Sequence, residues 1–409
     1  MMKRKMIMSS LAAFAVLLAG CSVLSNSDKP VTRDSGTHFA ADALKPFVDS
    51  GALPGAITVL SKGNIQETAC VGWADVDKKI PMSMDRTFMQ ASQTKGFCGV
   101  TIAILVEEGK LNLDDPVSKY LPEFKELKIA GKDKDGKPTL TPAKNVLTVR
   151  MVMNHTGGFP FEIPSKRKKG WPGVSLRDTA KEAASLPIMF EPGTKVQYSN
   201  TGIDIGAAVT EIVTGKPWDV FLKERVLDPL GMKDTTFNPT DEQLSRSISM
   251  YEIKPGQKPK LVLSRVWMPL PHNGPGIHPS AGAGLWTTAA DQLKFYRMLM
   301  NLGVGDNGVR ILKEETVRNL LATSTRPTAK MGGYSLGLVV NETAGIMAHG
   351  GAWGTSCSVN WKKKHLTLWV VQLVGKNYPW AKPWRDAYTK FYAAKIDNSD
   401  VDAYTGRLK

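Results

Sequence analysis

Hydrophobic and polar positions along this chain follow helical spacing in some segments and strand-like patterns in others. Residues 38–50 carry apolar side chains at helical spacing, which predicts a short helix. Residues 56–60 and 66–72 are rich in apolar and β-branched residues, and the turn residues between them predict a hairpin. Residues 94–108 are apolar at most positions and are followed by Gly109, which predicts a largely buried helix that ends there.

The rest of the chain is helical in its middle and strand-like near its end. Residues 110–275 have mostly helix and loop character, with a clear helix over 203–214. Residues 288–302 predict a further helix with Thr287 or Thr288 as its N-cap. The later strand-like segments are 334–340, 346–348, 355–361 and 366–374, and a closing helix is expected over 383–395. This order predicts an α/β (α+β) fold, in which one mixed, largely antiparallel sheet built from both termini is flanked by helices and carries a mostly helical insertion.

The first twenty residues have the features of an export signal. Residues 1–5 are positively charged, and the apolar run 6–18 is too short to span a bilayer as a stable helix. Two small residues then precede Cys21, an order that resembles a bacterial lipoprotein signal. The resemblance implies cleavage before Cys21, lipid attachment to its thiol and a polar tether over 21–37. An ordinary cleaved signal and a short membrane anchor are the alternatives.

The composition fits an exported globular protein. Hydrophobic residues make up 42% of the 409 residues and charged residues 22%, which excludes collagenous, low-complexity and wholly disordered chains. Lysine and arginine outnumber aspartate and glutamate by 53 to 38, giving a net charge of +15. A lipid-anchored envelope protein meets anionic headgroups and cell wall first, so we expect membrane contact through the anchor, proximity to peptidoglycan and no nucleic-acid partner. In a Gram-negative cell this location is the outer membrane or the periplasm-facing side. The basic runs 166–169 and 362–364 are interpreted as a solvated loop and a hairpin turn.

Cysteine and histidine spacing excludes several kinds of site. With Cys21 lipidated, the remaining Cys70, Cys98 and Cys357 cannot form a closed disulfide framework, and none has the C-x-x-C spacing of a zinc or redox site. The six histidines include no H-E-x-x-H pair, and no P-loop or dinucleotide fingerprint is present. We therefore expect no metal and no cofactor, which leaves a covalent serine mechanism.

Three serine motifs could supply a nucleophile. Residues 333–337 match G-x-S-x-G around Ser335, but they begin a strand-like run without a following helix, whereas this motif works at a turn between strand and helix. Ser92 and Lys95 form an S-x-x-K at the first turn of the predicted buried helix. A second S-x-x-K, at residues 165–168, follows a proline in a basic loop. Ser92 is therefore the preferred nucleophile, and Ser335 is interpreted as a strand residue.

The spacing of Ser92 and Lys95 suits nucleophilic catalysis. Residues three apart lie on one face of a helix, so the amine can reach the hydroxyl. Burial beside an apolar helix lowers the pKa of a lysine, and a helix N-terminus favours a negative oxygen, so both effects activate the serine. Cys98, one turn from Lys95, is interpreted as a buried helix contact.

Three motifs follow one another along the chain. Ser92-Gln93-Thr94-Lys95 comes first, Tyr198-Ser199-Asn200 second and His349-Gly350-Gly351 third. Their order and separations resemble the serine β-lactamase and penicillin-binding-protein superfamily, in the branch of class C β-lactamases, D-alanyl-D-alanine carboxypeptidases and β-lactamase-like esterases. Lesser matches are Gly109–Leu111, Leu113–Val117, Asn154–Gly158, Glu191–Gly193, Leu230–Met232 and Ala281–Leu285.

The resemblance implies a β-lactamase/transpeptidase-like fold and an acyl-enzyme mechanism. Ser92 would be the acylated nucleophile, and Lys95 its proton acceptor or electrostatic partner. Tyr198 would be a phenolate-like base that also protonates the leaving group, and Asn200 would orient Lys95 and the substrate. The backbone N–H groups of Ser92 and Ala352 would form the oxyanion hole, with Ala352 on the strand that carries the third motif. Whether Lys95 or Tyr198 accepts the serine proton stays open.

The third motif departs from the pattern of antibiotic-hydrolysing relatives. Those enzymes usually carry Lys-Thr-Gly, whose lysine and hydroxyl bind a substrate carboxylate. His349 is mostly uncharged at neutral pH and Gly350 has no hydroxyl, so carboxylate capture should be weaker. We expect His349 and Gly351 to orient a substrate without that carboxylate, such as an ester or a peptide. His155 is interpreted as a structural hydrogen-bonding residue in a loop.

The sequence thus predicts a lipid-anchored serine hydrolase, an esterase or amidase of small-molecule or peptide acyl substrates. Alternatives are a D-alanyl-D-alanine carboxypeptidase, a peptidase, a weak β-lactamase or, in another class, a catalytically idle lipoprotein that binds the cell wall. The expected organisation is a signal (1–20), a tether (21–37), a hydrolase domain (38–395) and a tail (396–409). Within the domain, the sheet part is expected at about 38–109 and 276–395 and the helical part at about 110–275.

Overall fold

The structure is a computed structural model of the chain, and it describes residues 39–63, 65–165, 174–253, 260–261, 278–326, 332–375 and 378–394. The predicted signal and tether, Cys21, the basic run 166–169 and the tail lie outside the described residues. Among the helices described, none combines the length and the apolar character needed to cross a membrane.

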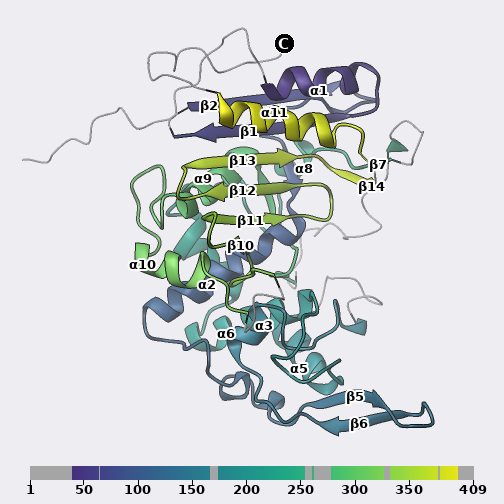
Figure 1. Cartoon of the computed structure of the whole chain (residues 1–409), viewed down its shortest axis with the longest axis vertical. Coiled ribbons are helices and arrows are strands. Elements are labelled where there is room, and N and C mark those ends of the chain that lie inside the picture. Colours follow the sequence, from purple (N-terminus) through teal and green to yellow (C-terminus); the bar gives the residue numbers. More distant parts are fainter. Residues whose placement is uncertain are drawn as a thin grey trace, which may run out of the picture.

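A seven-stranded sheet, built from both ends of the described chain, is the centre of the molecule (Figure 1). In spatial order its strands are β10 (Val339–Asn341), β11 (Ile346–Gly350), β12 (Ser356–Asn360), β13 (His365–Val370), β1 (Gly55–Lys62), β2 (Ile65–Asp75) and β3 (Ile80–Pro81). The two ends of the chain meet where β1 pairs with β13, with Val59 opposite Leu368. The predicted joining of N-terminal and C-terminal strands in one sheet is confirmed. Every pair described in this sheet is antiparallel, and parallel pairing occurs in a small second sheet.

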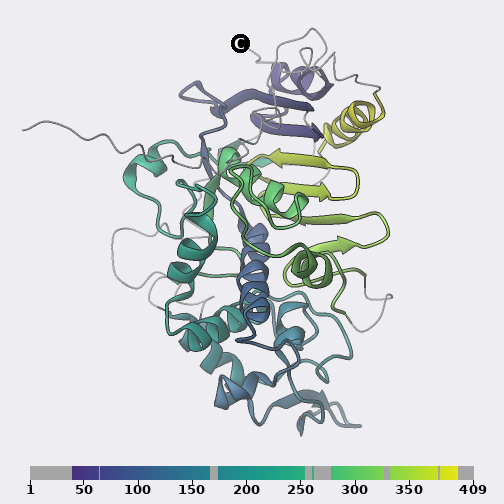
Figure 2. The same ribbon diagram turned by 90° about the vertical axis from the view of Figure 1, so that its left-hand side faces the viewer.

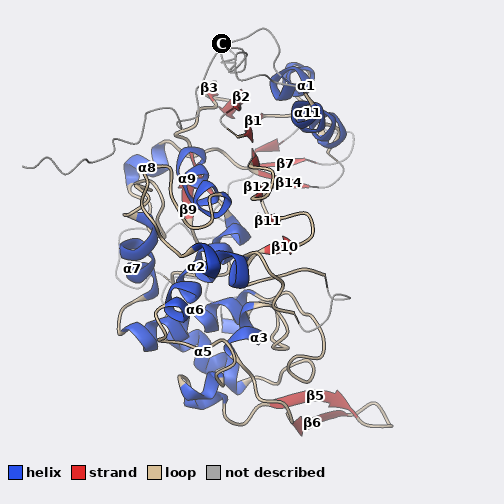
Figure 3. Ribbon diagram, turned by 60° about the vertical axis from the view of Figure 1, so that its left-hand side comes forward, coloured by secondary structure: helices blue, strands red, loops and turns tan. Residues whose placement is uncertain are grey.

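The sheet is covered by helices on both faces, as Figure 3 shows. One face packs against α1 (Phe39–Asp49) and α11 (Ala381–Ala393), which contact each other. The other face packs against α9 (Ala289–Met300), and α2 (Thr94–Glu107) lies on the same side of the sheet (Figure 2). Because side chains alternate between the faces of a strand, Val59 enters the core beside α2 while Leu60 enters the core under α1 and α11.

The remaining elements lie mostly between α2 and α9 in the sequence, and those between residues 128 and 214 form the lower part of the molecule in Figure 1. The helices are α3 (Val149–Met153), α5 (Leu176–Ser185), α6 (Asn200–Thr214), α7 (Trp218–Leu222), α8 (Asp241–Ser245) and, after α9, α10 (Glu314–Thr316). The short strands are β4 (Thr87–Met89), β5 (Lys128–Lys132), β6 (Pro138–Pro142), β7 (Tyr251–Ile253), β8 (Lys260–Leu261), β9 (Trp286–Thr288) and β14 (Leu373–Gly375). Strand β4 pairs with β9, β5 with β6, and β7 with both β14 and β8.

One element was not foreseen and one expectation about secondary structure was wrong. The hairpin of β5 and β6 lies inside the segment expected to be mostly helix and loop, and all residues of its two strands are exposed or half-buried. A strand that buries neither face shows no apolar alternation, so the sequence carried no signal for it. Residues 334–338 were expected to be strand, but they form an irregular loop, and β10 begins only at Val339.

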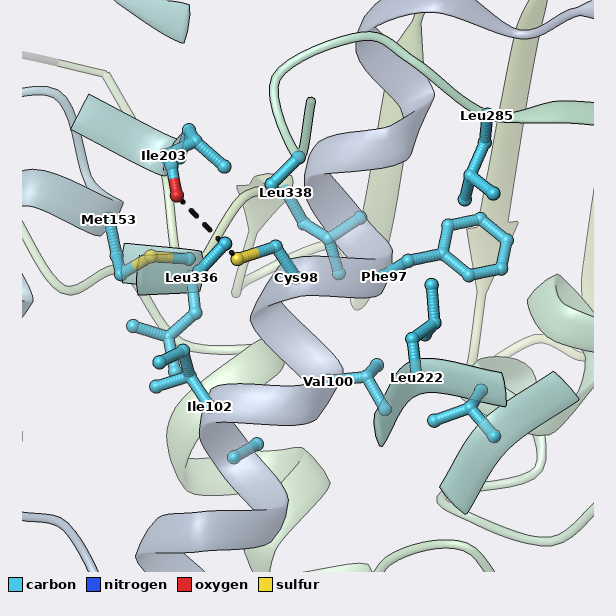
Figure 4. Close-up of a cluster of buried hydrophobic side chains, with 14 of the residues drawn as sticks. Phe97, Cys98, Val100, Ile102, Met153, Ile203, Leu222, Leu285, Leu336 and Leu338 are labelled. Carbon is cyan, nitrogen blue, oxygen red and sulfur yellow. Dashed lines mark hydrogen bonds between the residues drawn. The ribbon is translucent and has the colours of Figure 1, made fainter. Parts of the chain in front are cut away.

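The loop 334–338 is irregular because it packs its backbone directly against α2. A side chain at Gly99 of α2 would lie 1.6 Å from the carbonyl oxygen of Leu336, and one at Gly337 would lie 2.1 Å from that of Lys95. Figure 4 shows Leu336 and Leu338 beside Phe97 and Cys98 on this helix. Gly337, a glycine of the G-x-S-x-G sequence, therefore permits close packing and does not form a catalytic turn.

Candidate active site

Ser92 lies on a short turn in front of α2. Residues Ala91–Gln93 form a 3₁₀ turn, and Ala91 has a positive φ of 49°, which is strained for a residue with a side chain. From Thr87 to Leu105 every residue is buried except Ser92, which is partly exposed. The turn therefore presents one hydroxyl from an otherwise buried segment, at the positive end of the α2 dipole.

Lys95 is fully buried, and its amine is held by three oxygen atoms. Nζ lies 3.1 Å from Oγ of Ser92, 2.7 Å from Oδ1 of Asn200 and 2.6 Å from the carbonyl oxygen of Gly282. It also lies 4.5 Å from the centroid of the Tyr198 ring. The structure thus brings together Ser92, Lys95, Tyr198 and Asn200, as predicted.

A buried carboxylate fixes the backbone that receives Lys95. Asp204, on α6, accepts the N–H of Gly282 at 3.1 Å and the hydroxyl of Ser280 at 3.2 Å. Nε2 of His278 lies 3.5 Å from the same carboxylate, and both side chains are fully buried. A side chain at residue 282 would lie 2.7 Å from Cβ of Asn200, so glycine is required there. Asp204 therefore positions the carbonyl that holds Lys95.

The start of α6 places Tyr198 and Asn200 on either side of a cap. Ser199 is the N-cap: its hydroxyl accepts the N–H of Gly202 at 3.0 Å and donates to the carbonyl of Pro160 at 2.6 Å. Asn200 presents Oδ1 to Lys95, while its Nδ2 donates to Oε1 of Glu162 at 3.1 Å. The amide of Asn200 therefore connects an amine and a carboxylate.

Tyr198 is a neutral phenol at physiological pH. Burial raises the pKa of Tyr198 to about 12, and a hydrogen bond with Ser92 opposes that rise. The nearby lysine was expected to favour a phenolate, but burial, which disfavours the charged form, is the largest cause of the shift in this pKa. In the free enzyme, Tyr198 is therefore set to donate a proton.

The third motif lies next to the nucleophile segment. The N–H of Gly351 donates to the carbonyl of Thr355 at 2.7 Å, and a side chain at Gly351 would lie 2.4 Å from the carbonyl oxygen of Gln90. Ala352 was expected on the strand, but β11 ends at Gly350, and Ala352 is exposed in the turn that follows. Among the hydrogen bonds of the described loops, turns and helix ends, none is donated by the backbone N–H of Ser92 or Ala352.

His349 is turned toward a second tyrosine. Its Nδ1 lies 2.6 Å from the carbonyl of Gly350, and its Nε2 lies 3.1 Å from the hydroxyl of Tyr334. Burial, helped by the charge of Lys95, lowers the pKa of His349 to about 3, so the ring is neutral. Nδ1–H therefore donates to the carbonyl, and Tyr334 donates to Nε2. Only 6% of His349 is exposed, so its substrate-orienting role stays a prediction.

His155 fills the space between the two tyrosines. Its ring lies 4.5 Å from that of Tyr198 and 4.7 Å from that of Tyr334. Its Nδ1 accepts the N–H of Ser199 at 3.3 Å, which agrees with the structural role expected for it. Burial and the charge of Lys95 hold the pKa of His155 well below its usual range, so this ring is also neutral.

The other sequence candidates do not join this group. Ser335 is buried in its loop, and its hydroxyl lies 3.5 Å from the carbonyl of Leu338. Cys98 is buried, with Sγ 3.8 Å from the carbonyl of Ile203, and burial raises its pKa, so it is not a nucleophile (Figure 4). The three described cysteines are free, and no group of metal-ligating side chains is found within the described ranges. The second S-x-x-K includes residues outside those ranges.

Sequence reasoning missed three residues of this site, Glu162, Asp204 and Tyr334, and noted Gly282 only within the match at 281–285. Asp204 had a detectable signal, because it is a charged residue within the buried run that α6 forms from Asn200 to Thr210. Glu162 and Tyr334 lie in loops, where a single sequence offers no periodicity to indicate which side chains turn inward.

Comparisons with known proteins agree with this fold. The profile of the family described as Beta-lactamase matches residues 40–386. Protein Rv1367c of Mycobacterium tuberculosis (strain H37Rv) is 32% identical over 285 residues, which are 68% of this chain and 69% of that protein. EstCE1, described as a hydrolase with promiscuous acyltransferase activity, superposes with a TM-score of 0.68 and 22% identity over 86% of this chain and 97% of its own. The simvastatin synthase LovD from Aspergillus terreus superposes with a TM-score of 0.71 and 21% identity over 87% of this chain and 97% of its own.

Proposed function

Because the chain belongs to the beta-lactamase family and is a serine hydrolase, we propose that it forms an acyl-enzyme on Ser92 and releases the acyl group to water, as an esterase or amidase. The observation that carries the proposal is the 3.1 Å contact between Nζ of Lys95 and Oγ of Ser92. This contact joins a fully buried amine to the one partly exposed side chain of its segment. The alternative of a catalytically idle binding protein does not account for a strained turn that presents one hydroxyl to a buried amine.

In the acylation step, Oγ of Ser92 attacks the carbonyl carbon of the substrate while its proton passes to the amine of Lys95, which acts in its neutral form. The oxygen that becomes negative is stabilised by the backbone N–H groups of Ser92 and Ala352. When the intermediate collapses, the bond to the leaving group breaks, and the phenol of Tyr198 is set to give that group a proton. Water then attacks the acyl-enzyme and gives a proton to the deprotonated Tyr198. When this second intermediate collapses, the acid leaves and Lys95 returns the proton to Oγ of Ser92.

The charge of the site favours esters and amides over substrates that must present a carboxylate. His349 occupies the place of the lysine in the Lys-Thr-Gly pattern, and it is neutral and bound to Tyr334. Gly350, next to it, has no hydroxyl for a carboxylate oxygen. Efficient hydrolysis of β-lactams and of D-alanyl-D-alanine peptides is therefore not the activity that these residues support best.

A fluorophosphonate probe followed by intact-mass analysis tests the nucleophile. We expect one adduct on the parent protein and on Ser335→Ala, and none on Ser92→Ala. Turnover of short-chain p-nitrophenyl esters should fall by at least about a thousandfold in Ser92→Ala. An adduct on Ser92→Ala would overturn the assignment, and the absence of any adduct on the parent would favour the idle binding protein.

A cephalosporin and a D-alanyl peptide, assayed beside the esters, decide among the substrate classes.

We also propose that the enzyme is attached to the cell envelope through a lipid on Cys21. The order of basic, apolar and small residues in front of that cysteine supports the proposal. Metabolic labelling with a fatty-acid probe should mark the parent protein but not Cys21→Ser, because a serine cannot form the thioether. Equal labelling of both proteins would show that the anchor is elsewhere or absent.

A further inference from the structure

Glu162 is fixed beside the catalytic group by the loop that carries it. The carbonyl of Phe161 accepts the N–H of Asn200 at 2.9 Å, and the carbonyl of Pro160 accepts the hydroxyl of Ser199 at 2.6 Å. Oε1 of Glu162 accepts Nδ2 of Asn200 at 3.1 Å. Three consecutive residues are thus bound to the start of α6, which holds the Glu162 carboxylate one amide group away from Lys95.

The negative charge of Glu162 is not used by another described side chain. Within the part of the chain that the structure describes, no ion pair includes Glu162, and its side chain is half-buried rather than enclosed. The amine of Lys95 is bound to Oδ1 of Asn200, and the amide of Asn200 separates it from Glu162. The histidines of the site, His155 and His349, are neutral. Among the described side chains none forms an ion pair with this carboxylate, so it is available to a cationic group of a substrate.

Phe161, the residue before Glu162 in the same loop, carries an exposed aromatic ring. Phe161 is 42% exposed, and its ring lies 6.2 Å from the Tyr198 ring, with 22° between the ring planes. A large apolar side chain exposed at the edge of a catalytic group is available to contact substrate. The face of an aromatic ring attracts cations, and a neighbouring carboxylate adds to that attraction.

We propose that Glu162 and Phe161 form a subsite for an ammonium group of the substrate, so that the preferred substrates are esters or amides with a cationic amine near the reacting carbonyl. The inference rests on the proposed function, since it assigns a substrate class to the same acyl-enzyme. Glu162 contacts Asn200 and Phe161 contacts Tyr198, and both of these partners lie beside the nucleophile. A substrate carboxylate would meet repulsion at the same place.

Two p-nitrophenyl esters of equal shape test the subsite: the 4-(trimethylammonio)butyrate, which carries a permanent positive charge, and the neutral 5,5-dimethylhexanoate. In the parent, kcat/KM for the cationic ester should exceed that for the neutral one by about threefold to tenfold. Glu162→Gln should bring this ratio close to one. Glutamine keeps an oxygen for Nδ2 of Asn200, so the variant removes the charge and retains the hydrogen bond. The quaternary amine does not titrate, so pH does not affect the comparison.

Glu182→Gln is the matched control. Glu182 is also half-buried and accepts the N–H of Ser165 at 3.0 Å, but it does not contact Asn200, so this variant should keep the ratio of the parent. Equal kcat/KM for the two esters in the parent, or a ratio unmoved by Glu162→Gln, would overturn the subsite while the acyl-enzyme stands. Failure of both esters and of the fluorophosphonate to modify Ser92 would overturn the proposed function, and the subsite with it.

Discussion

The amine of Lys95 donates a 2.6 Å hydrogen bond to the carbonyl of Gly282, and the N–H of the same glycine donates to Asp204 at 3.1 Å. One peptide segment therefore connects the catalytic amine to a fully buried carboxylate on another helix. The direction in which Lys95 points depends on this connection, because a lysine side chain has four rotatable bonds and Ser92 restrains only its end.

Asp204→Asn should lower kcat about tenfold with little change in KM. The variant removes the charge from hydrogen bonds that hold the Gly282 segment, and hydrogen bonds to charged groups contribute about 1.5–3 kcal/mol. Steady-state kinetics at several pH values, normalised to sites titrated with the fluorophosphonate, provide the measurement. The pH dependence of kcat should also change, because the amine of Lys95 loses a fixed partner.

Asp291→Asn is the control for this change. Asp291 is also a buried aspartate, and it accepts the N–H of Asp234 at 2.8 Å, far along the chain from Lys95. We expect this variant to be less stable, but its kcat per fluorophosphonate-titrated active site should depend on pH as in the parent. The same loss of kcat in both variants would show that Asp204 serves stability alone.

Gly351→Ala should abolish most activity, whereas Gly350→Ala should retain most of it. A side chain at residue 351 would lie 2.2 Å from Oγ1 of Thr355 and 2.4 Å from the carbonyl of Gln90, so the third motif would have to move away from the nucleophile segment. At residue 350 the nearest atom lies at 3.6 Å, which is an ordinary contact. Ester hydrolysis and thermal unfolding of the two variants, measured side by side, test this difference. Equal activities of the two variants would indicate that the backbone around residue 351 can accommodate a side chain without disturbing the nucleophile segment.

Tyr198→Phe should lower kcat/KM about tenfold to a hundredfold without removing an ionisation between pH 6 and 10. A pKa raised to about 12 means that the phenol stays protonated across this range, so Tyr198 cannot produce a limb of the pH profile there. The pH dependence of kcat/KM in parent and variant is the measurement. A limb near pH 8 that is present in the parent and lost in the variant would instead identify Tyr198 as the base.

Glu67 should make stability depend on pH. Its carboxyl is buried under the first turn of α1, where Oε1 accepts the N–H of Ala40 at 2.7 Å, and burial raises the pKa of Glu67 to about 7. The unfolded chain loses this proton near pH 4.5 and the folded chain near pH 7, so the free energy of unfolding should fall across that window, by about 3 kcal/mol. Glu67→Gln should remove most of this decline, as chemical denaturation at pH 5 and pH 8 would show. An equal decline in the variant would assign it to other groups.

The sequence determined the elements and the reactive group. Helical spacing located α2, α6 and α9 to within a few residues, and the S-x-x-K at a buried helix start identified Ser92 and Lys95. These signals were readable because both are local: a helix repeats its contacts every three or four residues, and residues 92 and 95 meet within one turn.

Only the tertiary structure decided what surrounds Lys95. Its partners Asn200 and Gly282 lie 105 and 187 positions away in the sequence, and no local pattern indicates that these segments meet. The same reason explains why residues 334–338 pack as a loop although they are strand-like in sequence, since the close approach of Leu336 to Gly99 depends on how the sheet and α2 meet. The orientation of His349 toward Tyr334 and the place of Glu162 beside Asn200 are contacts of this kind. Sequence periodicity reports which side of an element is buried, whereas the partner of a buried polar group is fixed by packing between distant segments.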